Sequence, residues 1–330
     1  MELKYSIGID IGGTKCAIIL GAADIHQEAD KVVLQKQVFA TTRDPEETIK
    51  TIFDTIDKLL SERNINTNQL AGVGISCGGP LDAKNGIILN PPNLCGWDHI
   101  PITDILHERY DVRVKLENDA NACAVAEWKY GAARGYSNII FLTFGTGLGA
   151  GIILNGKLYS GTNNMAGESG HIRLADFGPV GYGKAGSFEG FCSGGGIARL
   201  AGQIALEHIQ RGESPSFCPT VESISDVTAK SVAEAADKRD ILAKEVYEIS
   251  GEYLGRGLSV IIDILNPEII ILGSIFSRSE HLLRPAMERV LKRESISLSH
   301  DVCKIVPAGL GENIGDYAAL SLVLGDDIYE

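Results

Sequence analysis

Two matched segments constrain the fold more than any other feature of this sequence. Residues 7–20 read IGIDIGGTKCAIIL, and residues 142–154 read LTFGTGLGAGIIL. Each combines an apolar strand, a turn rich in glycine and threonine, and a second strand that ends in Ile-Ile-Leu. Either segment alone would more often be an ordinary β-hairpin. Because internal duplication decides architecture, the pair instead predicts two similar lobes with a phosphate chain between them.

The second segment also has the glycine spacing of a dinucleotide-binding turn, G-x-G-x-x-A. That fingerprint needs a helix after the glycines, so that the pyrophosphate lies at the helix N-terminus. Here Gly151 is followed by IILNGKLY, and Asn155-Gly156 between two short apolar runs predicts a β-hairpin. The sequence therefore argues against a nicotinamide or flavin site. It favours glycine turns whose backbone N–H groups bind phosphate.

Length and composition restrict the class of protein. The 330 residues are enough for two domains, and 44% hydrophobic and 22% charged residues are typical of a soluble globular protein. A net charge of -13 without a basic patch argues against nucleic-acid binding. No apolar run reaches the ~20 residues of a membrane span, and no secretion signal is seen, so we expect a cytoplasmic protein that does not bind membranes. The 7 cysteines form no C-x-x-C pair, which indicates reduced core thiols.

Strands alternate with helices along the chain, which predicts an α/β fold. Asp44-Pro45-Glu46-Glu47 is a helix start, with a cap, an early proline and acidic residues in the first turn. A long helix is expected from Arg239 to Leu265, and a closing helix in GDYAALSLVL. Residues 155–195 are rich in glycine and irregular, and a loop of this length in a compact domain is usually functional or disordered.

Several polar residues stand where chemistry could take place, and each has a structural alternative. Asp10 adjoins the first glycine turn, where a carboxylate can hold Mg²⁺ through water or simply cap the turn. Thr14 and Lys15 could bind phosphate, although Lys15 could equally be a solvated strand residue. Asn118-Asp119 lies where a strand ends and a helix begins, so the pair is either a helix cap or a ligand-binding pair.

The glycine-rich loop contributes Glu168, His171 and Glu189. Polar groups that converge from such a loop suit a polyhydroxylated ligand. The structural alternatives are a hydrogen-bonded core histidine for His171 and a solvated or capping acid for Glu189.

Taken together, these segments resemble the ROK family (repressors, open reading frames and kinases), sugar kinases within the actin-like ATPase superfamily. The motifs, in the family's order, are DIGGTK at 10–15, GISCGGPLD at 74–82, ENDANACAVAE at 117–127, LTFGTGLGAGIILNGKLYSG at 142–161, AGESGH at 166–171 and GSFEGFCSGG at 186–195. The resemblance implies a two-lobed, ribonuclease H-like α/β fold with the active site in the cleft between the lobes. Residues 1–118 and 310–330 would form the small lobe and residues 119–309 the large lobe, in a homodimer.

The resemblance also implies roles for individual residues. Asp119 would be the base that takes the proton of the sugar hydroxyl group, and Asp10 would hold Mg²⁺ through water. The remaining sugar-site residues would be Gly79, Asn118, Glu168, His171 and Glu189. ATP would be bound by Asp10, Gly12, Gly13, Thr14, Lys15, Gly145, Thr146, Gly147, Gly149 and Gly273. The segment ILGSIF around Gly273 departs from the family's usual run of glycines.

These roles imply an ATP- and Mg²⁺-dependent hexose kinase that acts on the 6-hydroxyl group, with glucose as the first choice of substrate. N-acetylmannosamine, N-acetylglucosamine, fructose, allose and β-glucosides are the alternatives. A sugar-sensing repressor of the same family needs a DNA-binding domain ahead of the first glycine turn, and a turn that begins at residue 10 leaves no room for one. A nicotinamide dehydrogenase is disfavoured by the hairpin that follows the second glycine turn.

One departure from the family concerns a metal. The family often carries C-x-C-G-x-x-G-C after the Gly-His pair, and those three cysteines bind a structural zinc together with the histidine. The matching positions here are Val180, Tyr182 and Ser187, and Cys192 alone lies nearby. One thiol and one histidine do not close a tetrahedral site, so we expect no zinc. We expect apolar packing of Val180 and Tyr182 to hold this loop instead.

Overall fold

A computed structural model describes residues 5–23 and 31–324 of the chain. Contacts divide the chain into two compact units, which are described separately below. The first unit comprises Met1–Ser137, Gly151–Ala166 and Gly309–Glu330, and the second comprises Asn138–Ala150 and Gly167–Ala308. The lobe boundaries expected from the resemblance, after residues 118 and 309, stay a prediction. None of the helices in the described ranges combines the length and apolar character that crossing a membrane requires.

The first unit is built on a five-stranded sheet with the order β3-β2-β1-β4-β8. Its strands are β1 (Tyr5–Ile11), β2 (Lys15–Ala22), β3 (Val33–Ala40), β4 (Leu70–Cys77) and β8 (Val114–Asn118). β1 and β2 are antiparallel across the first glycine turn, as the sequence predicts. β1, β4 and β8 are parallel, and Ile11, Cys77 and Asn118 are in register at their carboxyl ends. The loops that follow these three strands therefore leave the sheet from one edge.

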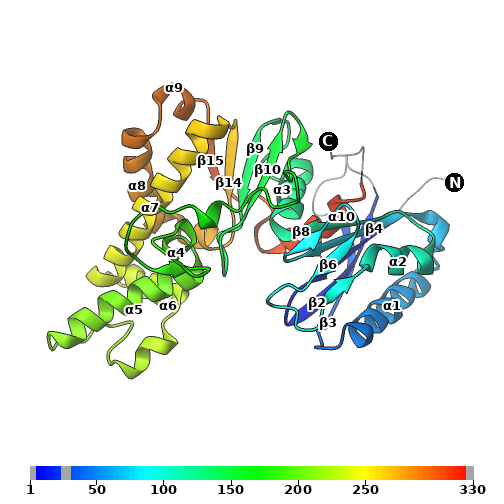
Figure 1. The fold of residues 1–330 in the computed structure, drawn as a ribbon, viewed down its shortest axis with the longest axis horizontal. Helices are drawn as coiled ribbons and strands as arrows, with labels where there is room; N and C mark the ends of the chain where they lie inside the picture. Colours follow the sequence, from blue (N-terminus) through cyan, green and yellow to red (C-terminus); the bar gives the residue numbers. More distant parts are fainter. Residues whose placement is uncertain (1–4, 24–30, 325–330) are drawn as a thin grey trace. The chain divides into compact units, whose positions relative to one another are not determined.

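Helices cover both faces of this sheet (Figure 1). They are α1 (Pro45–Glu62), α2 (Ile102–Tyr110), α3 (Asp119–Tyr130) and α10 (Ile314–Ser321). α1 and α2 pack on one face, and α3 and α10 on the other. As predicted, Asp44 caps α1, and its side chain accepts a hydrogen bond from the N–H of Glu46 at 2.9 Å. α10 lies so close to β4 that a Cβ atom on Gly74 would overlap the carbonyl oxygen of Ala319.

A buried carboxylate ties α3 to two loops of the first unit. Glu127 is 0% exposed and accepts hydrogen bonds from the backbone N–H groups of Ala132 (2.7 Å), Gly309 (3.1 Å) and Leu310 (2.9 Å). Because an unpaired backbone N–H is costly to bury, this one side chain replaces several missing backbone partners. The segment that returns to the first unit at Gly309 is thus fixed to the helix that begins at Asp119.

Smaller elements complete the first unit. They are β5 (Leu81–Asp82), β6 (Ile87–Leu89), β7 (Asp98–Ile100), β10 (Ala150–Leu154), β11 (Lys157–Leu158) and the 3-10 helices Thr67–Gln69 and Gly311–Asn313. β10 and β11 form the predicted hairpin, with positive φ at Asn155 (52°) and Gly156 (74°). The chain therefore passes from the second glycine turn into a strand and not into a dinucleotide-binding helix.

The second unit contains three parallel strands in the order β9-β14-β15. Its strands are β9 (Ile139–Leu142), β12 (Val180–Gly181), β13 (Lys184–Ala185), β14 (Ile269–Leu272) and β15 (Lys304–Pro307). Its helices are α4 (Phe188–Phe191), α5 (Gly194–Gln210), α6 (Ala229–Asp237), α7 (Ile241–Leu265), α8 (Ile275–Glu294), α9 (Ser297–His300) and the 3-10 helices Ser169–His171 and Glu222–Asp226. α7 confirms the predicted long helix, which begins after its cap at Asp240 and ends at Asn266.

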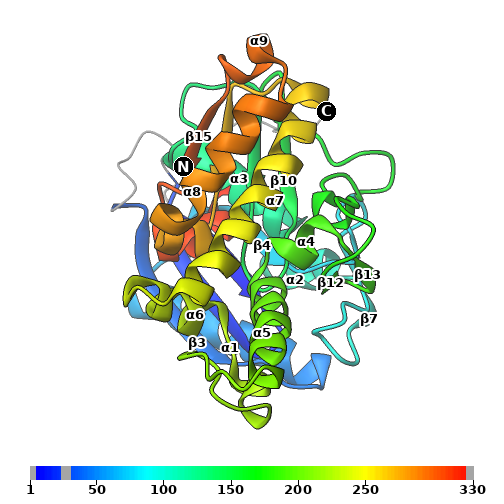
Figure 2. The same ribbon diagram turned by 90° about the vertical axis from the view of Figure 1, so that its left-hand side faces the viewer.

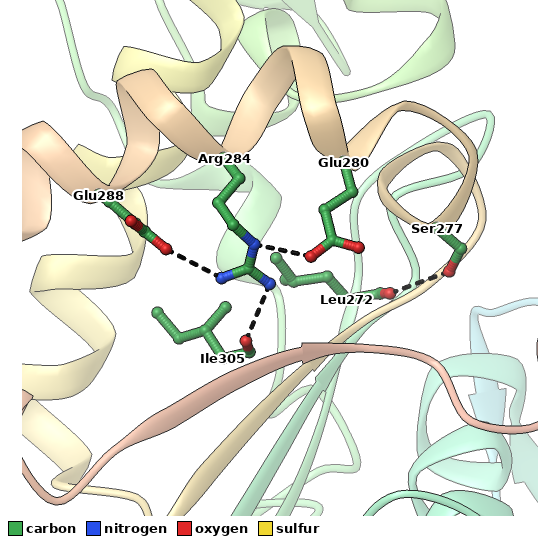
Figure 3. A network of polar contacts seen from close by, with 6 residues as sticks. All are labelled: Leu272, Ser277, Glu280, Arg284, Glu288 and Ile305. Carbon is green, nitrogen blue, oxygen red and sulfur yellow. Dashed lines mark hydrogen bonds and ion pairs between the residues drawn. The ribbon is translucent and has the colours of Figure 1, made fainter.

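α7 and α8 run side by side in both views (Figures 1 and 2). Arg284 fixes α8 to the sheet of this unit. Its guanidinium group donates to Glu280 (2.6 Å), to Glu288 (3.2 Å) and to the carbonyl oxygen of Ile305 in β15 (3.1 Å), as Figure 3 shows. The α/β class predicted from the alternation of elements is confirmed in both units.

Candidate functional site

The shared edge of β1, β4 and β8 brings four of the candidate residues together in the first unit. Asp10 lies near the end of β1, Gly79 follows β4, and Asn118 and Asp119 join β8 to α3. A Cβ atom placed on Gly79 would stand 3.5 Å from Nδ2 of Asn118, so the two positions are neighbours. Ligands of open α/β sheets bind at such an edge.

Asn118 and Asp119 both contact the first turn of α3. The Asn118 side chain caps the helix by accepting a hydrogen bond from the N–H of Ala120 at 2.9 Å, as the structural alternative predicted. Oδ1 of Asp119 accepts from the same N–H at 2.8 Å. Burial raises the pKa of Asp119, and this hydrogen bond opposes the rise. The Asp119 carboxyl group is therefore more basic than an ordinary aspartate.

Asp10 is held in a cluster of acidic groups. Burial, followed by the charge of Asp119 and then that of Asp316, raises the pKa of Asp10 from 3.8 to about 6. Lys36 and Lys15 oppose the rise. Because two carboxylates repel a third, this cluster has the charge that favours a bound cation.

Asp316 is a member of this cluster that the sequence did not single out. It lies in the first turn of α10, and Lys36 of β3 pairs with it at 2.6 Å. A Cβ atom on the preceding Gly315 would stand 3.4 Å from Oδ2 of Asp10. In the sequence, Asp316 is only an acidic residue at the start of a helix, and nothing there places it beside residue 10.

The first glycine turn closes on itself and on a neighbouring loop. The N–H of Gly12 donates to the carbonyl oxygen of Lys15 at 3.0 Å, and the Thr41 hydroxyl group donates to the carbonyl oxygen of Gly12 at 2.7 Å. A cavity of about 220 Å³ adjoins Gly13 and is lined in part by Thr41 and Asn93. Thr14 and Lys15, the next two residues of the turn, are exposed. The turn therefore has free space and accessible polar groups on one side.

The second glycine turn is contacted by the carboxylate of Glu189, which the sequence analysis assigned to the sugar site. Oε2 of Glu189, in α4, accepts a hydrogen bond from the N–H of Leu148 at 3.1 Å. A Cβ atom on Gly147 would lie 2.8 Å from the same oxygen, so a larger residue there would displace the Glu189 carboxylate. Within the turn, the N–H of Gly145 donates to the carbonyl oxygen of Gly147 at 3.0 Å. Glu189 thus contacts the proposed phosphate turn directly.

Gly273 and the start of α5 meet the same turn from other elements of the second unit. The N–H of Gly273 donates to the carbonyl oxygen of Leu142 at 2.9 Å, and the N–H of Gly194 donates to that of Gly145 at 2.7 Å. Ser274, in the segment ILGSIF that departs from the family's usual run of glycines, has a φ of 48°. Its hydroxyl group accepts a hydrogen bond from Arg278 at 3.0 Å. The adenosine side implied for Gly273 therefore differs from a plain glycine turn.

The loop that carries Glu168 and His171 also reaches the second glycine turn. The carbonyl oxygen of Gly167 accepts from the N–H of Ala150 at 2.8 Å, and Gly170 packs against the backbone of Leu148. Glu168 precedes the short 3-10 helix that ends at His171, and both side chains are exposed. The structure thus gathers Glu168, His171 and Glu189 around one turn of the second unit.

The expectation that Val180 and Tyr182 hold this loop by apolar packing is wrong. Their side chains are 44% and 78% exposed, because both belong to a short surface hairpin, β12–β13. The loop is held by polar contacts instead: Lys184 Nζ donates to the carbonyl oxygen of His171 (2.7 Å), and Arg173 donates to that of Ala185 (2.8 Å). The third matching position, Ser187, is fully buried as the cap of α4.

The thiol nearest this loop is turned into the interior. Cys192 is 0% exposed, donates a hydrogen bond to the carbonyl oxygen of Ser250 at 3.4 Å, and has a pKa raised by burial. In the described part of the chain, no three His, Cys, Asp or Glu side chains are grouped so that they could hold a metal. The zinc content of the protein stays a prediction.

Comparisons with known sequences and structures agree on one family. The sequence model of the ROK family matches residues 6–326. The chain is 32% identical to a glucokinase of Halalkalibacterium halodurans, over 96% of this chain and 93% of the relative. It is 26% identical to a xylose repressor of Caldicellulosiruptor bescii, over 97% of this chain and 78% of the relative. A crystal structure of a ROK glucokinase from Streptomyces griseus with glucose and AMPPNP is similar with a TM-score of 0.73 at 29% identity, covering 96% of this chain and 98% of that one.

Proposed function

The chain belongs to the ROK family and has the fold of its actin-like ATPases, and from this premise we propose that it is an ATP-dependent hexose kinase. In the proposal it transfers the γ-phosphoryl group of ATP to the 6-hydroxyl group of glucose. Glucokinase relatives at about 30% identity support the kinase class. N-acetylated hexosamines, fructose, allose and β-glucosides are the alternative acceptors.

The observation that carries the proposal is the position of the Asp119 carboxyl group at the start of α3, at the edge of the sheet where the parallel strands end. Its raised pKa makes it a better proton acceptor than an ordinary aspartate, and its place at the ligand-binding edge of the sheet suits a general base. Asp119 accepts the proton of the sugar hydroxyl group as the new P–O bond forms. Asn118, whose side chain caps the same helix turn, orients the sugar beside Asp119 in this proposal.

The glycine turns supply the phosphate-binding groups. In this proposal the turns Gly12–Lys15 and Gly145–Gly149 bind the phosphate oxygens through backbone N–H groups other than those of Gly12, Gly145, Leu148 and Gly149, which already donate within the protein. The turn at Gly273 lies on the adenosine side. Phosphoryl transfer depends on positioning and on charge stabilisation, which such turns provide without side-chain chemistry. Glu168, His171 and Glu189 of the second unit bind the remaining sugar hydroxyl groups in this proposal, and Gly79 leaves room for the ring next to Asn118.

The negative charge around Asp10 suits a hydrated Mg²⁺ and not a directly ligated one, since no three His, Cys, Asp or Glu side chains of the described residues are grouped as metal ligands. Asp10 holds the ion through water in this proposal, and a divalent cation there relieves the repulsion among Asp10, Asp119 and Asp316. When bound, the ion neutralises charge on the phosphate oxygens. The Lys36–Asp316 pair at 2.6 Å holds the third carboxylate toward β3.

A sugar-sensing regulator without catalysis is the second candidate, because a xylose repressor matches 97% of this chain. A coupled assay with ATP, Mg²⁺ and a panel of hexoses separates the two. We expect turnover on glucose that disappears in Asp119→Asn while glucose binding by calorimetry persists. Glucose or xylose binding without turnover in the wild-type protein would support the regulator, and no sugar binding at all would refute both.

A further inference from the structure

The β12–β13 hairpin contacts His171 in two independent ways. Nζ of Lys184, at the start of β13, donates a hydrogen bond to the backbone carbonyl oxygen of His171 at 2.7 Å. The ring of Tyr182 meets the imidazole ring edge to face, with centroids 6.2 Å apart and planes at 74°. One contact fixes the backbone of His171 and the other its side chain. An edge-to-face pair is the arrangement that aromatic quadrupoles favour.

The loop of this hairpin holds a tyrosine in a conformation that tyrosine disfavours. Tyr182 and Gly183 are the two residues between the strands, with φ of 42° and 73°, and a type I′ turn requires positive φ at both. Asparagine or glycine normally occupies the first position, because a bulky side chain is strained there. Tyr182 is also 78% exposed, so burial does not explain its presence. The Tyr182 ring contacts His171 despite the backbone strain and the solvent exposure at this position, which points to a role for the ring.

The hairpin is seated firmly enough to orient another residue. Gly181 packs against α4, where a Cβ atom would lie 2.8 Å from Oγ of Ser187. Arg173 ties the other strand through the carbonyl oxygen of Ala185 at 2.8 Å. Ser187 caps α4, the helix that carries Glu189. The hairpin therefore has fixed contacts on both strands, and Tyr182 projects from a rigid base.

We propose that the β12–β13 hairpin positions His171 for sugar binding, with Tyr182 and Lys184 as the positioning residues. The inference rests on the proposed sugar-kinase function, and it adds residues that act on the sugar through His171. Lys184 sets the direction of the backbone at His171. The Tyr182 ring limits rotation of the imidazole, so that its nitrogen atoms meet the sugar hydroxyl groups without a prior loss of rotamer entropy.

Tyr182→Asn is the decisive variant, because asparagine suits positive φ and relieves the backbone strain while it removes the ring. We expect its melting temperature to equal or exceed that of the wild type, whereas the glucose KM rises about threefold to tenfold, the size of a lost aromatic contact. The ATP KM and kcat at saturating glucose should stay within about twofold. Tyr182→Phe keeps the ring and should restore the wild-type glucose KM.

Lys184→Met should raise the glucose KM in the same way, and Lys184→Arg should rescue it by donating to the same carbonyl oxygen. Phe177→Ala is the matched control, because Phe177 is an aromatic residue of the same loop that is 87% exposed. Phe177→Ala should change neither the glucose KM nor the ATP KM. An unchanged glucose KM in Tyr182→Asn, or an equal rise in the ATP KM, would overturn the proposal.

A second measurement separates this inference from the kinase assignment. The imidazole C–H resonances of His171, identified by their loss in His171→Gln, report the Tyr182 ring without any sugar or ATP. We expect them to shift in Tyr182→Asn and to stay in place in Phe177→Ala. A wild-type protein without kinase activity would refute the proposed function, whereas unmoved His171 resonances in Tyr182→Asn would refute only the positioning role of the β12–β13 hairpin.

Discussion

Oε2 of Glu189 accepts a hydrogen bond from the N–H of Leu148 at 3.1 Å, and this bond joins the proposed sugar-binding region of the second unit to its glycine turn. A residue that only binds sugar would affect sugar affinity alone. We therefore expect Glu189→Ala to raise both the glucose KM and the ATP KM, because the glycine turn loses its acceptor. Initial-rate kinetics with each substrate varied in turn measure the two constants.

Glu168→Ala and His171→Ala are the matched variants for Glu189→Ala. Each removes a proposed polar partner of the sugar and should weaken sugar affinity by about 1–3 kcal/mol with little change in ATP affinity. If all three variants lost both affinities equally, the loop would have collapsed, and the separate roles would be wrong. If Glu189→Ala lost sugar affinity alone, its contact with Leu148 would have no role in nucleotide binding.

Asp119→Asn tests the proposed base. Asparagine keeps the size of the side chain and an oxygen that can accept from the N–H of Ala120, but it cannot take the proton of the hydroxyl group. A general base contributes ~10²–10⁴-fold, so kcat should fall by that order while the melting temperature is kept or raised. Near-normal turnover on the true substrate would show that another group accepts the proton.

The acidic cluster predicts a pH dependence of stability. The pKa of Asp10 rises from 3.8 in the unfolded chain to about 6 in the fold, so the folded state binds this proton more tightly. Asp10 therefore favours the fold most at low pH, and this contribution is lost as the pH rises through about 6. The shift of about two pKa units corresponds to roughly 3 kcal/mol at neutral pH.

Asp10→Asn should consequently be more stable than the wild type at pH 7, by up to about 3 kcal/mol, and equal to it near pH 4. Urea unfolding from pH 4 to 8 with a chelator present, so that no cation offsets the charge, measures the difference. The same variant should lose activity. A stability difference that does not change with pH would show that Asp10 is not strained by burial and by its acidic neighbours.

Glu127→Gln tests the anchor of the first unit. Glutamine presents an NH₂ group where the carboxylate accepted from Ala132, Gly309 and Leu310, so at least one backbone N–H is left unpaired. The free energy of unfolding should fall by about 1–3 kcal/mol or more, since the site is fully buried. Glu62→Gln, at an exposed position of α1, is the control. Equal stability of the two variants would contradict the anchoring role.

The zinc prediction has a direct test. Since Val180, Tyr182 and Ser187 replace the family's thiolates, a strong chelator should leave the melting temperature unchanged, and activity too once Mg²⁺ is restored. Elemental analysis should find no stoichiometric zinc. One tightly held zinc per chain that is lost in His171→Gln would refute this expectation.

Local patterns in the sequence predicted the parts of the fold that short segments determine. The cap at Asp44, the hairpin turn at Asn155-Gly156 and the strand end at Asn118 follow from residue preferences over a few positions, and the structure confirms them. The glycine turns were found because their composition is unusual and repeated. The roles of the candidate residues stay predictions.

Contacts between distant segments could not be predicted in this way. Lys36 and Asp316 are far apart in the sequence, and so are Leu148 and Glu189, and no local pattern pairs them. Tyr182 was misjudged because an aromatic residue in an apolar loop resembles a core residue. The exposure of Tyr182 depends on the β12–β13 turn, and a Tyr-Gly pair predicts such a turn less clearly than an Asn-Gly pair does.

The position of α10 has a consequence for how the protein folds while it is being synthesised. Residues of β1 and β2 near the start of the chain pack against Leu320, and Asp10 depends on Asp316 and Lys36 for its electrostatic surroundings. At about 5–20 residues per second, the ribosome completes α10 some tens of seconds after β1 emerges. Until then one face of the first sheet lacks one of the two helices, α3 and α10, that cover it. Nascent chains stalled before residue 314 should therefore bind apolar-surface chaperones and lack the Asp10 site, whereas chains extended past residue 324 should not.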